Sequence, residues 1–295
     1  MNNISCLCCP RKCRTDRNIN KGFCGFTNEI YASKAVLHKW EENCICGGNG
    51  AGAVFFSGCN LKCVYCQNYS ISTDNYGKPV TIERLADIFL ELQNEGASNI
   101  DLVTPTHFVY EIIKALDLVK HKLNIPVIYN CGGYELLSVI RDLNGYIDIY
   151  LPDLKYYDNS VALKYSGVSD YFEFASAAVL EMIKQTGKPQ FDGEMLKKGT
   201  IIRHLVIPTL RKDSIKIMEW INENIPADSF LISLMSQYTP NENVRKNYTE
   251  INRLITKMEY YSVVNKAVDY GFKGYMQDKT SAKSDYTPIF DLSGL

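Results

Sequence analysis

The chain has 295 residues, 46% of them hydrophobic and 22% charged, which is typical of a globular protein that buries a sizeable core. A net charge of −1 and a pI near 6.4 give it no bulk field for DNA, RNA or an anionic membrane. The N-terminus has no apolar run of the signal-peptide type, and no stretch approaches the ~18 apolar residues of a spanning helix. We therefore expect a cytoplasmic protein with no membrane and no DNA partner.

The first 48 residues form a cysteine-rich segment. Ten of the eleven cysteines lie within residues 1–66, and only Cys131 lies farther along the chain. Disulfides are rare in a reducing cytoplasm, so clustered thiols indicate metal ligation. The composition changes at the glycine-rich stretch 43–52. We predict two units, a metal-binding segment over 1–48 and an α/β domain over 49–295.

Beyond residue 50, short apolar runs alternate with amphipathic stretches. The apolar runs predict strands over 53–56, 100–103, 125–129, 147–151, 200–207 and 230–235. The intervening and following stretches predict helices from 81 and over 107–121, 134–143, 171–186, 214–223, 248–257 and 260–270. This alternation predicts a parallel sheet covered by helices, and on periodicity alone a doubly wound open sheet fits as well as a barrel.

Every predicted strand is followed directly by polar residues. These exits are Ser57-Gly58-Cys59, Thr104-Pro105-Thr106-His107, Asn130-Cys131-Gly132, Asp153-Leu154-Lys155, Arg203-His204 and Gln237-Tyr238. Parallel α/β sheets present their functional groups at the carboxyl ends of the strands. The exits therefore predict an active-site face.

Three cysteines with the spacing C-x₃-C-x₂-C follow the first predicted strand, at Cys59, Cys63 and Cys66. Three thiolates on one loop hold three irons of a cubane cluster and leave the fourth iron open to a chelating substrate. A zinc site is the alternative, but it would need a distant fourth ligand. Three unligated core cysteines are a further alternative.

This cysteine run, on the loop after the first strand, resembles the radical S-adenosylmethionine superfamily, and the likeness covers nearly all of 50–280. Residues 54–68, with 102–108, 149–156, 203–208 and 234–240, are similar to an iron–sulfur protein branch labelled pyruvate formate-lyase activating enzyme, whose function is mostly unestablished. The resemblance implies a partial (β/α)₆ barrel, a [4Fe–4S] cluster on the three cysteines, and S-adenosylmethionine on the open iron. It also implies an external one-electron reductant such as flavodoxin or ferredoxin. One electron would then cleave S-adenosylmethionine to a 5′-deoxyadenosyl radical, which abstracts hydrogen from a substrate.

The resemblance implies cofactor contacts for residues near the strand exits. Tyr65 would pack near the adenine, with a core tyrosine as the alternative. Thr104 and Thr106 stand where many members have Gly-Gly-Glu, so the chain departs from the general pattern there. Backbone carbonyls and the threonine hydroxyls would then meet the cofactor's amino group. Asn130 and Gln237 are predicted contacts to the ribose or adenine.

The charged residues at the exits are predicted to be functional as well. Asp153 and Lys155 match an Asp-x-Lys that lies near the cofactor and the substrate peptide in the pyruvate formate-lyase activator. We predict both as catalytic, with a plain ion pair as the alternative. Arg203 lies in an apolar strand and needs a carboxylate to offset its burial. The methionine carboxylate of the cofactor and a buried aspartate are the two alternatives.

A second set of thiols lies near the N-terminus, at Cys6, Cys9, Cys13 and Cys24. Four thiolates suit zinc, a single iron or a second cluster, and a redox or unligated role is the alternative. Positive side chains between them would lower the thiol pKa values and favour metal binding; they are Arg11, Lys12, Arg14 and Arg17. Cys8 would substitute for one ligand, while Cys44, Cys46 and Cys131 receive no role.

Several functions are compatible with these motifs. One is activation of a glycyl-radical enzyme, favoured by Asp153, Lys155 and Arg203 but weakened by the N-terminal segment, which such activators lack. Another is radical modification of a different peptide, an RNA or a small molecule. A third, from another class, is a non-catalytic zinc-binding protein. A nucleic-acid module built on the basic residues 11–17 ranks last, because no wider positive surface supports it.

Overall fold

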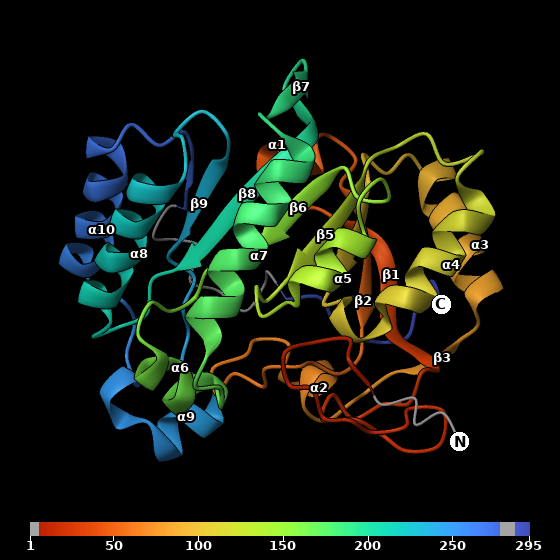
Figure 1. Ribbon diagram of the computed structural model, residues 1–295, viewed down its shortest axis with the longest axis horizontal. Coiled ribbons are helices and arrows are strands. Elements are labelled where there is room, and N and C mark those ends of the chain that lie inside the picture. The colour runs from red at the N-terminus through yellow and green to blue at the C-terminus, as the bar shows by residue number, and fades with distance from the viewer. Residues whose placement is uncertain (1–5, 278–286) are drawn as a thin grey trace.

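The computed structural model describes residues 6–277 and 287–295. Its centre is a sheet made of the strands β1 (Ile30–His38), β2 (Ala51–Phe56), β3 (Lys78–Val80), β4 (Ile100–Val103), β5 (Val127–Cys131), β6 (Ile149–Pro152), β7 (Gln190–Asp192), β8 (Met195–Leu205), β9 (Leu231–Met235) and β10 (Gly274–Met276). Their order across the sheet is β10-β9-β8-β6-β5-β4-β2-β1-β3, with β7 paired to β8 (Figure 1).

The six predicted strands correspond to β2, β4, β5, β6, β8 and β9, and they stand side by side in chain order. Each pairs in parallel with the next. A doubly wound sheet would reverse its strand order at a switch point, whereas a β/α barrel adds every new strand on the same side. In the described residues, the end strands β10 and β3 are not paired with each other. The fold is therefore an open, partial β/α barrel, as predicted.

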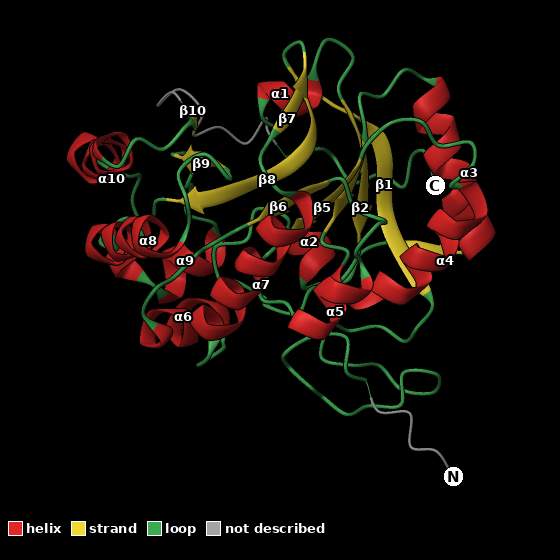
Figure 2. Ribbon diagram, turned by 45° about the horizontal axis from the view of Figure 1, so that its top comes forward, coloured by secondary structure: helices red, strands yellow, loops and turns green. Residues whose placement is uncertain are grey.

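Helices cover the outer face of the curved sheet (Figure 2). The longer ones are α3 (Ile82–Asn94), α4 (Val109–Val119), α6 (Asn159–Ser166), α7 (Tyr171–Thr186), α8 (Arg211–Asn224) and α10 (Lys257–Asp269). The shorter ones are α1 (Asn43–Cys46), α2 (Tyr69–Ser72), α5 (Leu137–Asp142), α9 (Glu242–Asn247) and the 3₁₀ turns Thr106–Phe108 and Thr249–Ile251. Of the helices in the described ranges, none has the length and apolar character needed to cross a membrane.

The core lies between the sheet and these helices. Helix α3 shows how the sequence builds it: Thr81 caps the helix by accepting from the backbone N–H of Arg84, and Leu85, Phe89 and Leu92 then point inward at helical spacing. The other half of the barrel buries Ile202 and Ile232 under α8 and α10 in the same way. This apolar layer leaves the carboxyl ends of the strands free for polar groups.

Several features differ from the predicted elements, including the short strands β3, β7 and β10 and the short helices α1, α2 and α9, which were not predicted. The segment before residue 49 supplies β1, which pairs antiparallel with β2 and extends the sheet; the division at residue 48 stays a prediction. Helix α6 was not predicted. The predicted helix over 248–257 is wrong, because a 3₁₀ turn and a loop occupy it and the chain becomes helical only from Lys257. A capping box between Thr256 and Glu259 fixes that start.

Candidate functional site

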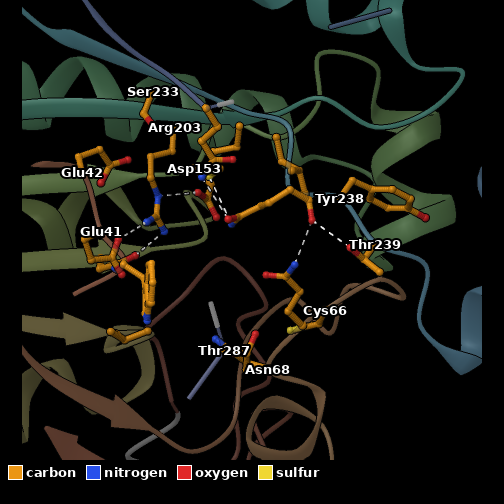
Figure 3. Close-up of a pocket in the computed structure, with 18 of the residues that line it drawn as sticks. Glu41, Glu42, Cys66, Asn68, Asp153, Arg203, Ser233, Tyr238, Thr239 and Thr287 are labelled. Atoms are coloured by element: carbon orange, nitrogen blue, oxygen red, sulfur yellow. Dashed lines mark hydrogen bonds and ion pairs between the residues drawn. The ribbon is translucent and has the colours of Figure 1, made fainter. Parts of the chain in front are cut away.

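A cavity of about 360 Å³ lies at the carboxyl ends of the parallel strands. Residues from the predicted exits and the cysteine loop line it; they are Cys63, Tyr65, Cys66, Asn130, Asp153, Lys155, Arg203, Gln237 and Tyr238. Figure 3 shows Asp153 and Arg203 on one wall, and Cys66 and Asn68 on the opposite side. The structure thus brings together eight of the residues predicted from separate motifs.

Arg203 is held by three groups of the protein. Its Nε lies 3.2 Å from Asp153 Oδ1, its Nη1 2.9 Å from Glu41 Oε2, and its Nη2 2.8 Å from Asn130 Oδ1 (Figure 3). Burial alone would lower the pKa of Arg203, but the carboxylates of Asp153 and Glu41 outweigh it and raise the pKa. The guanidinium is therefore a fixed cation in the cavity wall.

Asp153 is shared between two cations. Its second oxygen accepts from Lys155 Nζ at 2.5 Å while the first faces Arg203. Burial by itself would raise the pKa of Asp153, yet Lys155 and Arg203 together lower it. The pKa of Lys155 is raised, because the Asp153 carboxylate outweighs its burial. The ion pair considered as the alternative for these residues is thus present, and it places a positive charge beside Cys63.

The three thiols of the cysteine loop all have hydrogen-bond donors. The Leu61 N–H lies 3.4 Å from Cys59 Sγ, Ser166 Oγ 2.9 Å from Cys63 Sγ, and Ser72 Oγ 3.3 Å from Cys66 Sγ. Burial raises the pKa of the Cys66 thiol to about 12. Bound iron would remove that proton, and the donors would then stabilise the thiolates.

This donor set fits an iron–sulfur cluster by its chemistry, with soft sulfur ligands on one short loop at the edge of the cavity. Within 6–277 and 287–295, no three His, Cys, Asp or Glu side chains stand at the spacing of a metal site. The thiols of either cysteine set would have to turn toward a common centre when metal binds.

The other predicted cofactor contacts divide into two groups. Tyr65 and Gln237 both line the cavity, and the Tyr65 hydroxyl is hydrogen-bonded to that of Tyr156. Thr104 and Thr106 are not among the described residues that line the cavity. Thr106 is buried and donates to Glu135 at 2.7 Å. Thr104 has a φ of +59°, a costly backbone conformation for a β-branched residue.

Sequence reasoning missed two carboxylates that line the cavity, one of which pairs with Arg203. Glu41 and Glu42 come from the segment between β1 and α1 (Figure 3). Burial raises the pKa of Glu42, whose Oε2 has no hydrogen-bond partner in the described part of the chain. The only indication in the sequence was an adjacent pair of glutamates within a cysteine-rich segment. No local pattern shows that this pair meets a strand exit more than 150 residues farther along the chain.

The predicted N-terminal ligands lie elsewhere. None of Cys6, Cys9, Cys13 and Cys24 is among the described residues that line the cavity. They occupy the loops that precede β1, beside the cysteine loop. The two cysteine sets are therefore neighbours with different surroundings.

Comparison with known proteins places these features in a wider group. A family model described as the Radical SAM superfamily matches residues 53–221, more than half of the chain. An uncharacterized protein of Methanocaldococcus jannaschii, MJ0674, is 32% identical over 279 residues, which cover 91% of this chain and 75% of that protein.

Two solved structures share the fold at low sequence identity. A radical SAM methyltransferase from Sphaerobacter thermophilus aligns with a TM-score of 0.52 and 11% identity over 77% of this chain and 66% of that one. SuiB from Streptococcus suis aligns with a TM-score of 0.51 and 13% identity over 77% of this chain. The alignment covers 48% of SuiB, so this chain matches about half of that protein.

Proposed function

The chain belongs to the radical SAM superfamily, and on that premise we propose that Cys59, Cys63 and Cys66 hold the [4Fe–4S] cluster and that the adjoining cavity binds S-adenosylmethionine. Cluster and S-adenosylmethionine are the cofactors of this superfamily, and its members need an external electron donor. The observation that carries the assignment is that two of these thiols, Cys63 and Cys66, line the same cavity as the network of Asp153, Lys155 and Arg203.

When bound and reduced, the cluster supplies the electron that cleaves S-adenosylmethionine to methionine and a 5′-deoxyadenosyl radical, which abstracts hydrogen from the substrate. The chain's own residues bind and orient the cofactor. Asn130 accepts a hydrogen bond from Arg203 and so fixes the orientation of its guanidinium, and Asp153 fixes the Lys155 ammonium group in the same way. The remaining N–H groups of the Arg203 guanidinium are available to a carboxylate, such as that of the methionine moiety.

Two further contacts belong to this proposal. Tyr65 on the cysteine loop and Gln237 at the β9 exit both line the cavity, and they are the proposed contacts of the adenosine moiety. At the β4 exit, Val103 lines the cavity, but Thr104 does not, and the Thr106 hydroxyl is engaged with Glu135. The amino-group contact predicted for these two threonines is therefore not part of this proposal.

For the substrate, we propose a peptide, and in particular the glycyl loop of a glycyl-radical enzyme, with ferredoxin or flavodoxin as the reductant. Support comes from Asp153 and Lys155, which match the Asp-x-Lys of the pyruvate formate-lyase activator and lie on the cavity wall. A different peptide, an RNA or a small molecule is the competing substrate class.

The test is anaerobic purification and cluster reconstitution, followed by reduction with dithionite, addition of S-adenosylmethionine and an assay for 5′-deoxyadenosine. We expect product from the wild type and none from the Cys59→Ala/Cys63→Ala/Cys66→Ala variant. Cys44→Ala, which changes a buried cysteine outside both sets, should behave as wild type. A reconstituted wild type that binds only zinc and gives no product would overturn the assignment.

A second experiment addresses the substrate. Deuterium in a glycine-containing peptide should be transferred to 5′-deoxyadenosine if a glycyl position is the target. Uncoupled 5′-deoxyadenosine without deuterium, for all such peptides, would favour the competing classes.

A further inference from the structure

The N-terminal loops contain a group of thiols that the proposed cluster does not use. We propose that Cys6, Cys9, Cys13 and Cys24 bind a single thiolate-held metal ion, Zn²⁺ or Fe²⁺, and that Arg11 joins this site to the cysteine loop and positions it. The metal site stands on its own residues, whereas the positioning role rests on the proposed function.

The N-terminal loop folds back on itself and brings its thiols into one region. Cys13 Sγ and Cys24 Sγ face the same glycine, since a methyl group on Gly22 would lie 3.4 and 3.5 Å from them. The Cys6 backbone N–H donates to the Thr15 carbonyl at 2.9 Å, and the Lys12 N–H donates to the Cys9 carbonyl at 3.1 Å. These contacts fold the stretch that carries Cys6, Cys9 and Cys13, and the thiols would turn toward a common centre when the ion binds.

The backbone also supplies partners for these thiols. Cys24 Sγ donates to the Phe26 carbonyl, two residues farther on, at 3.8 Å. A backbone group two positions after a cysteine is a fixed partner that holds the sulfur in place without another side chain. The same spacing recurs in the cysteine loop, where the Leu61 N–H approaches Cys59 Sγ. Four such thiolates form a closed tetrahedral site that suits zinc or a single iron.

A buried cation accompanies the thiols. The Arg17 side chain is only 2% exposed and donates to the carbonyls of Phe26, Thr27 and His107. Its Nη1 also lies 3.7 Å from Cys8 Sγ. Four thiolates around a divalent ion carry two negative charges, and a guanidinium fixed by three carbonyls offsets part of that charge. Cys8 faces Arg17 and is the cysteine left outside the site.

Arg11 connects this loop to the cysteine loop. It follows Cys9 by two residues, across Pro10, whose ring fixes the intervening φ. Its Nε lies 2.8 Å from the Asn60 carbonyl and its Nη2 3.2 Å from that of Leu61, both between Cys59 and Cys63. Its Nη1 lies 2.7 Å from the Gly167 carbonyl, next to Ser166, which bonds Cys63.

A second contact locks the other side of the cysteine loop. Gly58 precedes Cys59, and a Cβ there would lie 2.6 Å from the Cys24 carbonyl. The N-terminal loop therefore flanks the cysteine loop at Gly58 and at Asn60–Leu61. An ion that fixes Cys9 and Cys24 fixes both contacts.

The experiment begins with the Cys59→Ala/Cys63→Ala/Cys66→Ala variant, which isolates the second site. Purified anaerobically, it should contain one zinc or iron per chain and no sulfide. Adding Cys9→Ala and Cys24→Ala should reduce the metal to none, while adding Cys44→Ala should not change it. Cobalt exchanged into the site should give the visible absorption of a tetrahedral thiolate complex. A folded triple variant without metal, or one with iron and sulfide, overturns the single-ion site.

The positioning role is tested in the wild-type background. Arg11→Ala should keep the second ion but lose its reconstituted cluster to a chelator several-fold faster, measured by bleaching. Arg14→Ala, which changes an exposed arginine of the same loop, should not. Equal bleaching of the two variants overturns the role of Arg11. A wild type that binds no cluster would instead refute the proposed function, and the metal count of the triple variant would still decide the second site.

Discussion

The two cysteine-bearing loops of this protein lie side by side but have opposite surroundings. In the loop from Cys59 to Cys66, two thiols line a cavity that also contains Asp153, Lys155 and Arg203. The N-terminal thiols instead lie outside that cavity, with the buried Arg17 and backbone carbonyls beside them. Thiols of the same chemistry thus have different neighbouring groups in the two loops, a charged cavity in one and a buried arginine with backbone carbonyls in the other.

The charged residues of the cavity distinguish the cysteine loop from the N-terminal loop, so the largest effect is expected when their network is broken. Asp153→Ala leaves the partly buried cations Lys155 and Arg203 without their shared carboxylate. We expect a loss of about 3 kcal/mol in the free energy of unfolding, measured with urea, and loss of 5′-deoxyadenosine formation. Asp117→Ala breaks a surface pair with Lys120 and should cost less than about 1 kcal/mol. Equal costs for the two variants would mean that the wall is not an electrostatic unit.

A buried carboxyl group beneath the two loops predicts a pH effect. Burial raises the pKa of Glu135 to about 8, and Thr106 donates to it. A carboxyl whose folded pKa lies above its unfolded value loses stability as the pH rises, here between about pH 4.5 and 8. Within that window this group should cost about 1.4 kcal/mol per pH unit.

Glu135→Gln should remove this dependence, so that its melting temperature changes less between pH 5 and 8 than that of the wild type. If the melting temperatures of the two proteins change with pH by the same amount across that range, Glu135 does not titrate there.

The contact between the loops can be broken at one glycine. Gly58 has a φ of +88°, and a Cβ there would collide with the Cys24 carbonyl. Gly145 has nearly the same φ, +89°, but open space around it. Gly145→Ala should lower the free energy of unfolding by about 1 kcal/mol, the cost of backbone strain alone, and Gly58→Ala should lower it by about 2 kcal/mol more, measured by urea unfolding. Equal losses for the two variants would show that the N-terminal loop can move away from Gly58 at no cost.

The smallest expected effect concerns the hydrogen bond that Ser166 donates to the cysteine loop. Ser166 donates to Cys63 Sγ, and a donor to a thiolate ligand stabilises the more negative, reduced cluster. Ser166→Ala should lower the cluster's midpoint potential by on the order of tens of millivolts in a dye-mediated titration followed by EPR. Ser160→Ala, an exposed position of the same helix, should leave it unchanged. A rise in potential, or no shift, would contradict a tuning role for Ser166.

Local sequence patterns were sufficient to predict the six parallel strands β2, β4, β5, β6, β8 and β9 and the position of the cysteine loop. Runs such as Ala51–Phe56 are apolar throughout because both faces of a parallel strand are covered, and that pattern is local. The spacing of Cys59, Cys63 and Cys66 is likewise local, since three ligands on one short loop need no distant partner. The polar exits followed from the shared direction of parallel strands, which brings their ends to one edge.

The tertiary structure decided which polar groups meet. Glu41 reaches Arg203 across 162 positions, and Arg11 reaches Gly167 across 156. No periodicity in either segment encodes those pairings, because they depend on how β1 extends the sheet and how the loop before it folds back. Thr106 shows the same dependence: its place at a strand exit was evident from the sequence, but packing turned its hydroxyl to Glu135. Short-range spacing fixes which chemistry a segment carries, whereas long-range packing fixes which groups share a site.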